Sequence, residues 1–572
     1  MCIRDRPYVQ DTWKLTSKLT LDLGLRWDYY PSYREVKNRF SFLSLTATNP
    51  LVNAPGALEF GGFGAGTCNC TQPVNDSMKN FGPRIGLAYQ AAPTTVIRGS
   101  YALIYTHGNA NGGSATSRQG SGLEGFNVTP ATTFVSPTQG QTGNSYWHLD
   151  SPYPAYTAPP TLNPALGTYY TSASTQASQT PSYADPYLGG RSPQFTNYSL
   201  GIQQALSSTI NFTLTYVGSE GRFLQPDTSN GRGIFTNGLD PKYLNLGTLL
   251  SSPASAANLA AVPTGLPYPT FGGVGNPTVS QALKPFPQYG SISDAYGFIG
   301  RTWYNSLQAY ATKRFSNGVS FLTDYTWSRS IDNNGTFRTG YDITGYAASD
   351  GQFHAARTLD RSLSLGDQRH KFVFTGAYNL PFGTGHLGGE NRLTRALFGG
   401  FRLSTIFNAY SGAPLSVTMN SANTNPAQNV AYPEINPTYA GNGRVAGLDR
   451  PHTQAALGQV QYLDPNAFVA TPNYIFATTA RTAAYHTLFQ PANYRSDASL
   501  RRAFAIPTHG LHEGTRLALE ADYFNITNHT HFVYSQSNAV VNTWGTASYG
   551  TMNVDSNYIP NRALQLAARI EF

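Results

Sequence analysis

Apolar and polar side chains alternate strictly along the segment from Leu19 to Tyr29. Every odd position is a leucine or an aromatic residue, and the even positions are polar or glycine. This alternation predicts a β-strand with one apolar and one polar face. Because it lasts for about ten residues and ends in aromatic rings, it is typical of a tilted membrane strand. Half-buried strands of soluble proteins are usually about five or six residues long.

The same alternation returns along the chain. It recurs in the segments 85–89, 97–105, 198–202, 210–216, 319–327, 372–380 and 517–523. With a first strand near Tyr8 to Leu15 and a last one at the C-terminus, the pattern predicts about thirteen strands, that is, six hairpins and a final unpaired strand. The first strand is expected to enter from the extracellular side and the last to end in the periplasm.

Two kinds of connection separate the predicted strands. Short turns are expected at 16–18, 91–94, 206–209 and 316–318. Long segments rich in Gly, Pro, Ser, Thr and Asn, expected to be structureless, cover 31–80, 107–193, 219–302, 329–368, 412–494 and 526–562. Compact soluble domains rarely contain such loops, and a sandwich or propeller would have evenly spaced turns. Short periplasmic turns alternating with long extracellular loops indicate an all-β, antiparallel transmembrane barrel.

The C-terminal segment keeps the alternation to the last residue. Leu564, Leu566, Ala568, Ile570 and Phe572 share one face. This looks like the terminal signal of outer-membrane proteins, which ends in an aromatic residue and which the barrel-assembly machinery reads. The alternative is an amphipathic edge strand, although an exposed apolar edge favours aggregation in a soluble protein.

The composition agrees with a transmembrane barrel and argues against a helical membrane protein and a nucleic-acid-binding protein. Only 12% of the 572 residues are charged, yet no run of about 18 apolar residues could form a membrane helix. Aromatic residues make up 13%. The net charge of +8 is scattered rather than clustered, so we expect no nucleic-acid partner.

No constellation of residues predicts chemistry. The chain has no nucleophile-elbow, zinc-protease or P-loop motif, so we expect neither an enzyme nor a cofactor. The residues that could bind a metal ion are expected not to do so. His529 and His531 are interpreted as interfacial residues, and the acidic residues Asp324, Asp332, Asp342 and Asp350 as a solvated surface. Cys68 and Cys70 lie in a Gly-rich loop, where a bridge between them would be strained, and they are interpreted as incidental.

The beginning of the chain is unusual. Residues 1–6 read MCIRDR, with no apolar stretch of a signal peptide behind them. This hexapeptide resembles leaders produced by translated adapter sequence, and it is a candidate non-native leader. A missing signal in an outer-membrane pattern suggests truncation.

Several motifs resemble the Oar-like subfamily of TonB-dependent transporters, which usually carries an N-terminal carboxypeptidase-regulatory-like domain. They are YVQDTWKL at 8–15, NFGPRIGLAY at 80–89, VIRGSYALIY at 96–105, YVGSEG at 216–221, YNSLQAYATKRF at 304–315, HKFVFTGAYNLPFG at 370–383 and FNITN at 524–528. Their order covers the chain from about Tyr8 to Phe572. No TonB box or plug is present among these residues.

The resemblance implies that residues 7–572 are the C-terminal portion of such a barrel, with about thirteen of about 22 strands, and that the plug and first strands are absent. It further implies location in the outer membrane and import of a bulky ligand, such as an oligosaccharide or siderophore. The implied partners are outer-membrane lipid, the TonB complex through the missing plug, and the barrel-assembly machinery. The alternatives are a passive porin, an adhesion barrel without TonB coupling, and a soluble secreted binding protein.

The predicted loop 107–193 is rich in aromatic residues. Tyr146, Trp147, Tyr153 and Tyr156 are the candidates for stacking on sugar rings, with polar neighbours supplying hydrogen bonds. The alternative is that these rings only pack the loop onto its neighbours and the barrel rim.

Overall fold

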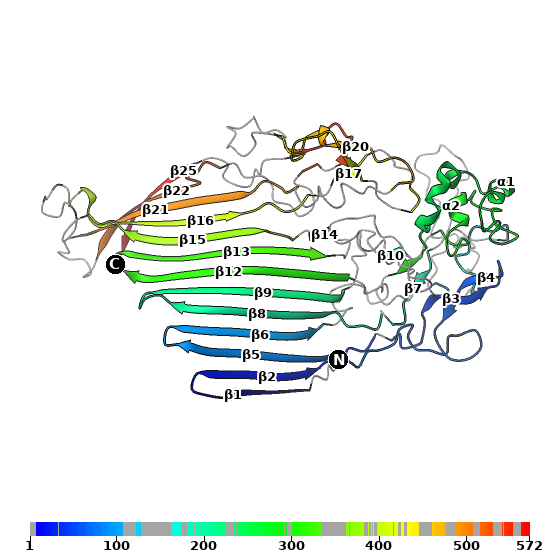
Figure 1. Cartoon of the computed structure of the whole chain (residues 1–572), viewed down its shortest axis with the longest axis horizontal. Coiled ribbons are helices and arrows are strands. Elements are labelled where there is room, and N and C mark those ends of the chain that lie inside the picture. Colours follow the sequence, from blue (N-terminus) through cyan, green and yellow to red (C-terminus); the bar gives the residue numbers. More distant parts are fainter. Residues whose placement is uncertain are drawn as a thin grey trace, which may run out of the picture.

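A single large antiparallel sheet dominates the computed structural model (Figure 1). The structure describes residues 7–32, 34–106, 122, 124–126, 162–173, 180–187, 189–224, 234–235, 237–290, 292–294, 300–332, 362–364, 366–382, 387, 391, 393, 397–415, 417–420, 425–427, 432–445, 460–475, 488–506, 515–529, 540–541, 543–552 and 562–571. Among these residues, no helix has both the length and the apolar character needed to cross a membrane.

Thirteen strands follow one another across this sheet in chain order. They are β1 (Tyr8–Lys14), β2 (Leu19–Trp27), β5 (Phe81–Ala92), β6 (Thr95–Tyr105), β8 (Gln194–Ala205), β9 (Ile210–Leu224), β12 (Gly300–Ser316), β13 (Val319–Asp332), β15 (His370–Asn379), β16 (Phe401–Tyr410), β21 (Asn493–Ala505), β22 (Arg516–Phe524) and β25 (Ala563–Glu571). The short β14 (Ser362–Leu363) also pairs with β13. The predicted count of about thirteen is confirmed, and the edge strands β1 and β25 are not paired with each other among the described residues.

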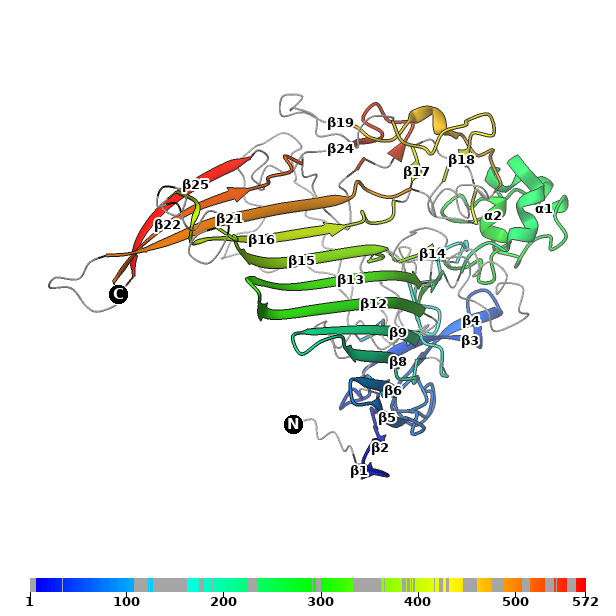
Figure 2. The ribbon, with the colours of Figure 1, turned by 60° about the vertical axis from the view of Figure 1, so that its left-hand side comes forward.

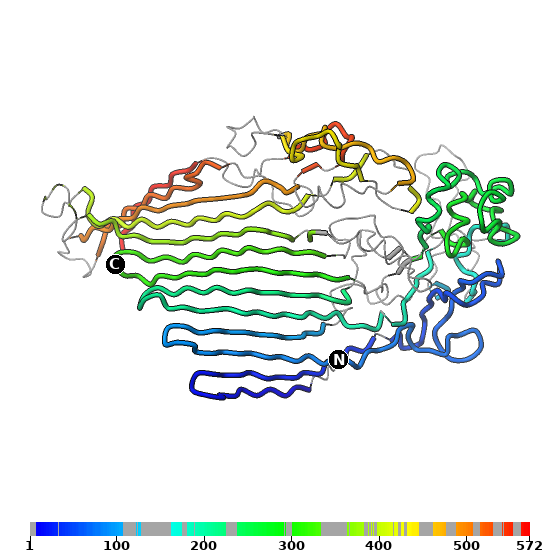
Figure 3. The backbone as a smooth tube through the Cα atoms, viewed as in Figure 1, coloured from blue at the N-terminus to red at the C-terminus, as the bar shows by residue number. Residues whose placement is uncertain are grey.

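The connections differ sharply between the two ends of the strands. Four short turns lie at one end, together with the longer connections 380–400 and 506–515, and the longest connections lie at the other end. The strand β1 begins at the end with the longest connections, and β25 finishes at the end with the turns (Figure 3). The turn between β12 and β13 has Asn317 at φ 51° and Gly318 at φ 76°. Two successive positive φ values define a two-residue hairpin turn, and Asn-Gly is the pair that adopts it most readily.

The two faces of the sheet have opposite character because register keeps alternate residues on one side. Leu21, Leu87, Gly99, Leu200 and Tyr216 are cross-strand neighbours along one row of the outer face. Large apolar side chains are exposed on this face: Leu23, Leu25, Ile85, Tyr101, Leu200, Ile202, Tyr216, Leu307, Tyr325, Trp327, Leu500, Leu519, Leu564, Leu566 and Ile570. The opposite face, here called the polar face, carries residues such as Asp22, Arg84, Ser100, Ser199, Arg402, Asp497 and Asp522. Figure 2 shows the sheet curving from β1 to β25.

The apolar core lies mainly in the long connections. Among the described residues, all buried apolar side chains except Tyr105 and Ala518 lie outside the thirteen long strands. One cluster combines Val52, Leu239, Leu259 and Phe271 with Tyr170 and Tyr474, so it joins four different connections. These connections form a cap at one end of the sheet (Figure 1).

The expectation of structureless loops is therefore wrong for much of the cap. Residues 31–80 contain the hairpin β3 (Ser41–Asn49) and β4 (Ala54–Phe60), and 219–302 contains η2 (Pro241–Ser251), α1 (Ala256–Ala260) and α2 (Val279–Ala282). A three-stranded sheet is built from β10 (Ile234–Phe235), β11 (Ser293–Asp294) and β7 (Ser182–Tyr183). These pieces are too short to show a clear period in sequence, and packing between connections stabilises them.

The connections of the later strands build a second part of the cap. It contains β17 (Thr418–Met419) paired with β23 (Thr543–Trp544), β18 (Glu434–Ile435) with β20 (Phe468–Val469), and β19 (Val460–Gln461) with β24 (Thr551–Met552), together with η4 (Pro465–Ala467). Val417, Leu463, Phe468 and Met552 are buried in its core. Two connections that are distant in sequence thus form one packed unit.

Cys68 and Cys70 are joined by a disulfide bond, with their Cα atoms 5.1 Å apart. The interpretation of these cysteines as incidental is wrong. Backbone hydrogen bonds exchanged between Gly62 and Cys70, of 2.9 and 3.1 Å, fold the loop back on itself.

Candidate functional site on the polar face

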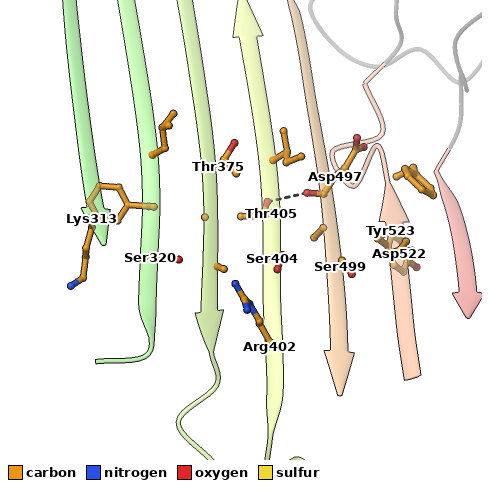
Figure 4. Close-up of a pocket in the computed structure, with 17 residues that line it drawn as sticks. Lys313, Ser320, Thr375, Arg402, Ser404, Thr405, Asp497, Ser499, Asp522 and Tyr523 are labelled. Carbon is orange, nitrogen blue, oxygen red and sulfur yellow. Dashed lines mark hydrogen bonds between the residues drawn. The ribbon is translucent and has the colours of Figure 1, made fainter. Parts of the chain in front are cut away.

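A cavity of about 650 Å³ extends along the polar face over β12, β13, β15, β16, β21 and β22 (Figure 4). A cavity formed by one continuous sheet lies on the concave side of that sheet, so the polar face is the inner face. The strands bring its polar lining together by register. Ser404 on β16 lies opposite Ser499 on β21, which lies opposite Asp522 on β22.

Four charged residues line this cavity: Lys313, Arg402, Asp497 and Asp522. The side chains of Arg402 and Asp522, which have opposite charges, make no hydrogen bond or ion pair with any residue that the structure describes. Arg402 also lies directly opposite Arg501 in the register, and Arg501 forms an ion pair with Glu571. The cavity therefore presents a cation and an anion that can pair with groups on a bound molecule or domain.

The two other charged residues of the cavity, Lys313 and Asp497, already have partners. The ammonium group of Lys313 donates a hydrogen bond to the hydroxyl of Ser316. Asp497 has three partners. The Asp497 carboxylate lies 2.8 Å from Nε of Arg495 and accepts a hydrogen bond of 2.8 Å from the backbone N–H of Asn525. The carbonyl oxygen of Asp497 accepts a hydrogen bond of 3.0 Å from the hydroxyl of Thr405. Asp497 thus links β21 to β16 and to the residue that follows β22. The side chains of Arg402 and Asp522 remain available to a ligand.

Apolar groups complete the lining. Leu322 and Ile406 both project from the polar face, where they are 37% and 49% exposed, and Phe524 lies at the end of β22. A few charged and polar groups set among apolar ones are typical of a binding surface. The alternation along β16, β21 and β22 could reveal the charges of Arg402, Asp497 and Asp522, but the assembly of one cavity from six strands depends on register.

The predicted aromatic candidates Tyr146, Trp147, Tyr153 and Tyr156 lie outside the described residues. Other aromatic residues of the same loop are described. Tyr183 is buried in a core cluster with Leu43 and Tyr289, and Tyr170 packs on the larger cluster of the cap. Tyr187 is exposed, with the Arg191 guanidinium 4.1 Å from its ring centroid. For Tyr170 and Tyr183, packing of the loop is the role that the contacts support.

Of the predicted assembly signal, Leu564, Leu566 and Ile570 lie on the outer face of β25, where they are exposed, and Phe572 lies outside the described residues. Leu564 and Leu566 lie opposite Tyr523 and Ala521 of β22, and Ile570 lies opposite Leu517. The final strand is therefore the edge of the sheet, with its apolar residues turned outward.

The described residues contain no group of three His, Cys, Asp or Glu side chains placed to hold a metal ion. His529 is buried and stacks on Tyr494, with ring centroids 3.7 Å apart. Asp324 lies on the polar face and Asp332 is buried, so the interpretation of both as a solvated acidic surface is wrong for Asp332. His531, Asp342 and Asp350 lie outside the described residues.

An antiparallel meander with an apolar outer face, a polar concave face and connections of unequal length at its two ends defines a transmembrane β-barrel protein. The chain belongs to the family described as outer membrane beta barrel domain, which matches residues 4–565. The protein is accordingly located in the outer membrane.

Similar solved structures are outer-membrane receptors. One is the ferripyoverdine receptor of Pseudomonas aeruginosa bound to ferripyoverdine, with 11% identity, a TM-score of 0.33, and coverage of 98% of this chain and 38% of that one. Another is the ferric yersiniabactin uptake receptor FyuA from Yersinia pestis, with 10% identity, a TM-score of 0.35, and coverage of 99% and 45%. The chain thus covers less than half of these structures. No curated protein matches it.

Proposed function

We propose that the chain forms the C-terminal wall, extracellular cap and assembly signal of a TonB-dependent outer-membrane transporter of the Oar-like type. In this proposal residues 7–572 are the C-terminal portion of the barrel, and residues 1–6 are a non-native leader. The protein imports a bulky ligand, such as an oligosaccharide or siderophore, and catalyses no reaction. Its partners are the TonB complex, through an N-terminal plug, and the barrel-assembly machinery.

The observation that carries the proposal is the thirteen-strand sheet whose edge strands, β1 and β25, are not paired with each other in the described part of the chain. Barrels of about eight strands are filled by their own side chains, those of 16–18 strands leave an open channel, and those of about 22 strands hold a plug. A sheet that is still open after thirteen strands fits one of the wide barrels. The unpaired charges of Arg402 and Asp522 fit contact with a polar plug surface better than contact with bulk solvent alone.

The cap supports a receptor rather than a simple pore. Its connections are packed on one another through apolar clusters and can hold a binding surface in a fixed shape. A passive porin needs no such packed structure outside the membrane. Substrate selectivity would lie in this cap and in the plug.

The first test is to sequence the gene upstream of codon 7 in the source DNA. A signal peptide, a plug with a TonB box and further strands are expected. An authentic start with nothing upstream would contradict the proposal and favour a barrel without TonB coupling.

The second test asks whether the cavity faces a plug. Arg402→Glu in the complete gene is expected to loosen the plug and to make cells more sensitive to vancomycin, which is too large for ordinary porins. Arg329→Glu, at the opposite end of the strands on the outer face, is the matched control. Equal sensitivity of the two variants would argue against a plug at this cavity.

The aromatic loop gives a separate proposal, in which Tyr146, Trp147, Tyr153 and Tyr156 stack on a sugar ligand. Replacing Trp147 and Tyr153 with Ala is expected to abolish glycan binding by whole cells. Binding and uptake that stay unchanged would rule out this role and leave these rings as packing residues.

A further inference from the structure

A small loop that follows β4 in the cap carries the disulfide bond between Cys68 and Cys70 (Figure 1). Residues 63–66 of this loop are exposed, and both cysteines are half-buried. Around Gly64 and Gly66 there is open space where a side chain would begin. A molecule dissolved in the surrounding solvent can therefore approach the loop.

Backbone hydrogen bonds hold both cysteines independently of their sulfur atoms. The N–H of Cys68 donates a hydrogen bond of 2.8 Å to the carbonyl oxygen of Phe60. The backbone of Cys70 exchanges two hydrogen bonds, of 2.9 and 3.1 Å, with that of Gly62. No sulfur atom takes part in these contacts, so they remain when the S–S bond opens. The two thiols then stay close enough to form the bond again.

The ring that this disulfide closes is too small to stabilise the cap by much. A disulfide stabilises a fold mainly by restricting the unfolded chain, and the effect grows with the number of residues that the bond encloses. Only Asn69 lies between the two cysteines. The hairpin β3–β4 is anchored instead by the buried side chains of Leu58 and Phe60. The stability of the fold therefore gives little reason for this bond.

The residue inside the ring has a strained backbone. Asn69 has a φ of 52°, in the left-handed region that costs most residues free energy. The peptide group between Cys68 and Asn69 makes no hydrogen bond with any residue that the structure describes, so it can turn once the S–S bond opens. Opening therefore relieves the strain at Asn69 while both cysteines stay anchored. Strained or exposed disulfides are the ones that thiols reduce readily.

We propose that Cys68 and Cys70 form a site of thiol–disulfide exchange with small thiols that reach the cap from solvent. A thiolate attacks one sulfur atom and bonds to it as the Cys68–Cys70 bond breaks, and the other cysteine leaves as a thiolate that takes a proton from water. A second thiolate attacks the mixed disulfide in the same way and releases the oxidised small molecule. Two electrons thus pass from two thiols to the protein, which is left with two cysteine thiols.

This exchange site is separate from the polar-face cavity. It does not depend on TonB coupling or on the identity of the imported ligand, so its failure would leave the proposed transport function untouched.

The test uses glutathione as the probe, with the full protein extracted from outer membranes in dodecyl maltoside. After incubation, free thiols are blocked by alkylation, and trypsin digestion of the denatured protein releases residues 40–79, which contain Cys68 and Cys70 and no other cysteine. Mass spectrometry of this peptide gives the reduced fraction. Glutathione is expected to reduce the pair, and oxidised glutathione to close it again, while heat-shifted gel migration shows that the barrel stays folded.

Two substitutions of Asn69 test the role of the strained backbone. Valine disfavours a positive φ, whereas glycine adopts it freely. At a fixed ratio of reduced to oxidised glutathione, the ratio of open to closed ring should rise about tenfold in Asn69→Val and fall in Asn69→Gly. Both variants lose the hydrogen bond of 3.1 Å from the N–H of Gly64 to the Asn69 side chain, so opposite shifts identify the backbone as the cause.

The matched control is Asn53→Val, because Asn53 also has a φ of 52° and lies in the turn between β3 and β4, away from the cysteines. It should keep the wild-type ratio. A bond that glutathione opens only after the barrel has unfolded in SDS would overturn the proposal and make the disulfide a purely structural link. Two free thiols that oxidised glutathione fails to join would overturn it as well, and so would equal ratios in Asn69→Val and Asn53→Val.

Discussion

The side-chain amide of Asn49 donates a hydrogen bond of 3.2 Å to the hydroxyl of Tyr289, although 240 residues separate them in sequence. Both side chains are fully buried. The same amide also reaches the hydroxyl of Thr168 at 2.6 Å and the carbonyl oxygen of Gly56 at 3.3 Å. One side chain thus joins three connections that leave the sheet between different pairs of strands.

Asn49→Ala should therefore loosen the whole first part of the cap. Removing one partner of a buried hydrogen bond leaves polar groups unpaired and costs about 2 kcal/mol. Faster hydrogen exchange is expected in residues 41–60 and 279–290, with the long strands unchanged. Asn258→Ala, which removes an exposed hydrogen bond to the carbonyl of Pro253, is the matched control. Exchange that accelerates only near residue 49 would show that the three connections are not coupled.

Lys284 makes the stability of the cap depend on pH. Burial lowers the pKa of its ammonium group to about 8, and Nζ donates a hydrogen bond of 2.9 Å to the carbonyl oxygen of Gly290. In the unfolded chain a lysine has a pKa of about 10.4. Between these values the unfolded state binds more protons than the folded state, so stability rises with pH from about 8 to about 10.4. The full effect is about 3 kcal/mol at most.

Lys284→Met should remove this dependence and stabilise the cap at neutral pH, because the apolar stem stays and the buried charge is lost. Protection of residues 279–290 against hydrogen exchange, corrected for the intrinsic rate at each pH, is the measurement. Lys242→Met, which removes a more exposed ion pair with Asp240, should leave the wild-type slope. A variant Lys284→Met that still gains protection between pH 8 and pH 10 would contradict the assignment.

Neighbouring residues of one strand should respond oppositely to the same substitution. Leu200 lies on the outer face of β8 and is 59% exposed, whereas Ser199 lies on the polar face, where its hydroxyl is 2.7 Å from that of Ser100. Leu200→Arg places a charge in lipid and should cost about 2–4 kcal/mol near the bilayer midplane. Ser199→Arg, at the same depth, should cost far less. Urea unfolding in lipid vesicles measures both, and equal costs would mean that the two faces are wrongly assigned.

The sheet could be predicted from sequence because the pattern that predicts each strand lies within that strand. Each long strand carries its own alternation, and the short turns fix which strands pair. The segment predicted from Leu19 to Tyr29 therefore contains the whole of β2 and extends two residues beyond its end. The cap could not be predicted in this way. Asn49, Thr168 and Tyr289 carry no shared pattern, and their contact depends on the packing of three connections.

The cavity on the polar face could be predicted only in part. Alternation places Arg402 and Asp522 on the polar face, but only the registers of β16, β21 and β22 bring them to one cavity. The disulfide between Cys68 and Cys70 could not be predicted either, because the loop conformation that brings the two sulfur atoms together has no signature in sequence.

The last strand offers a test of assembly. Leu564, Leu566 and Ile570 are exposed on the outer face of β25, and with Phe572 they form the proposed signal for the barrel-assembly machinery. Replacing Leu566 and Ile570 with Asn should reduce the amount of folded protein in the outer membrane, because the machinery would no longer recognise the strand. Gln565→Asn with Ala567→Ser changes the polar face of the same strand and is the matched control.

The readout is the fraction of protein that resists SDS before heating, in cells and, separately, after refolding into lipid vesicles without the machinery. A loss in cells with normal refolding in vesicles would identify a recognition signal. An equal loss in both would instead mean that these residues only stabilise the folded sheet through their contact with lipid.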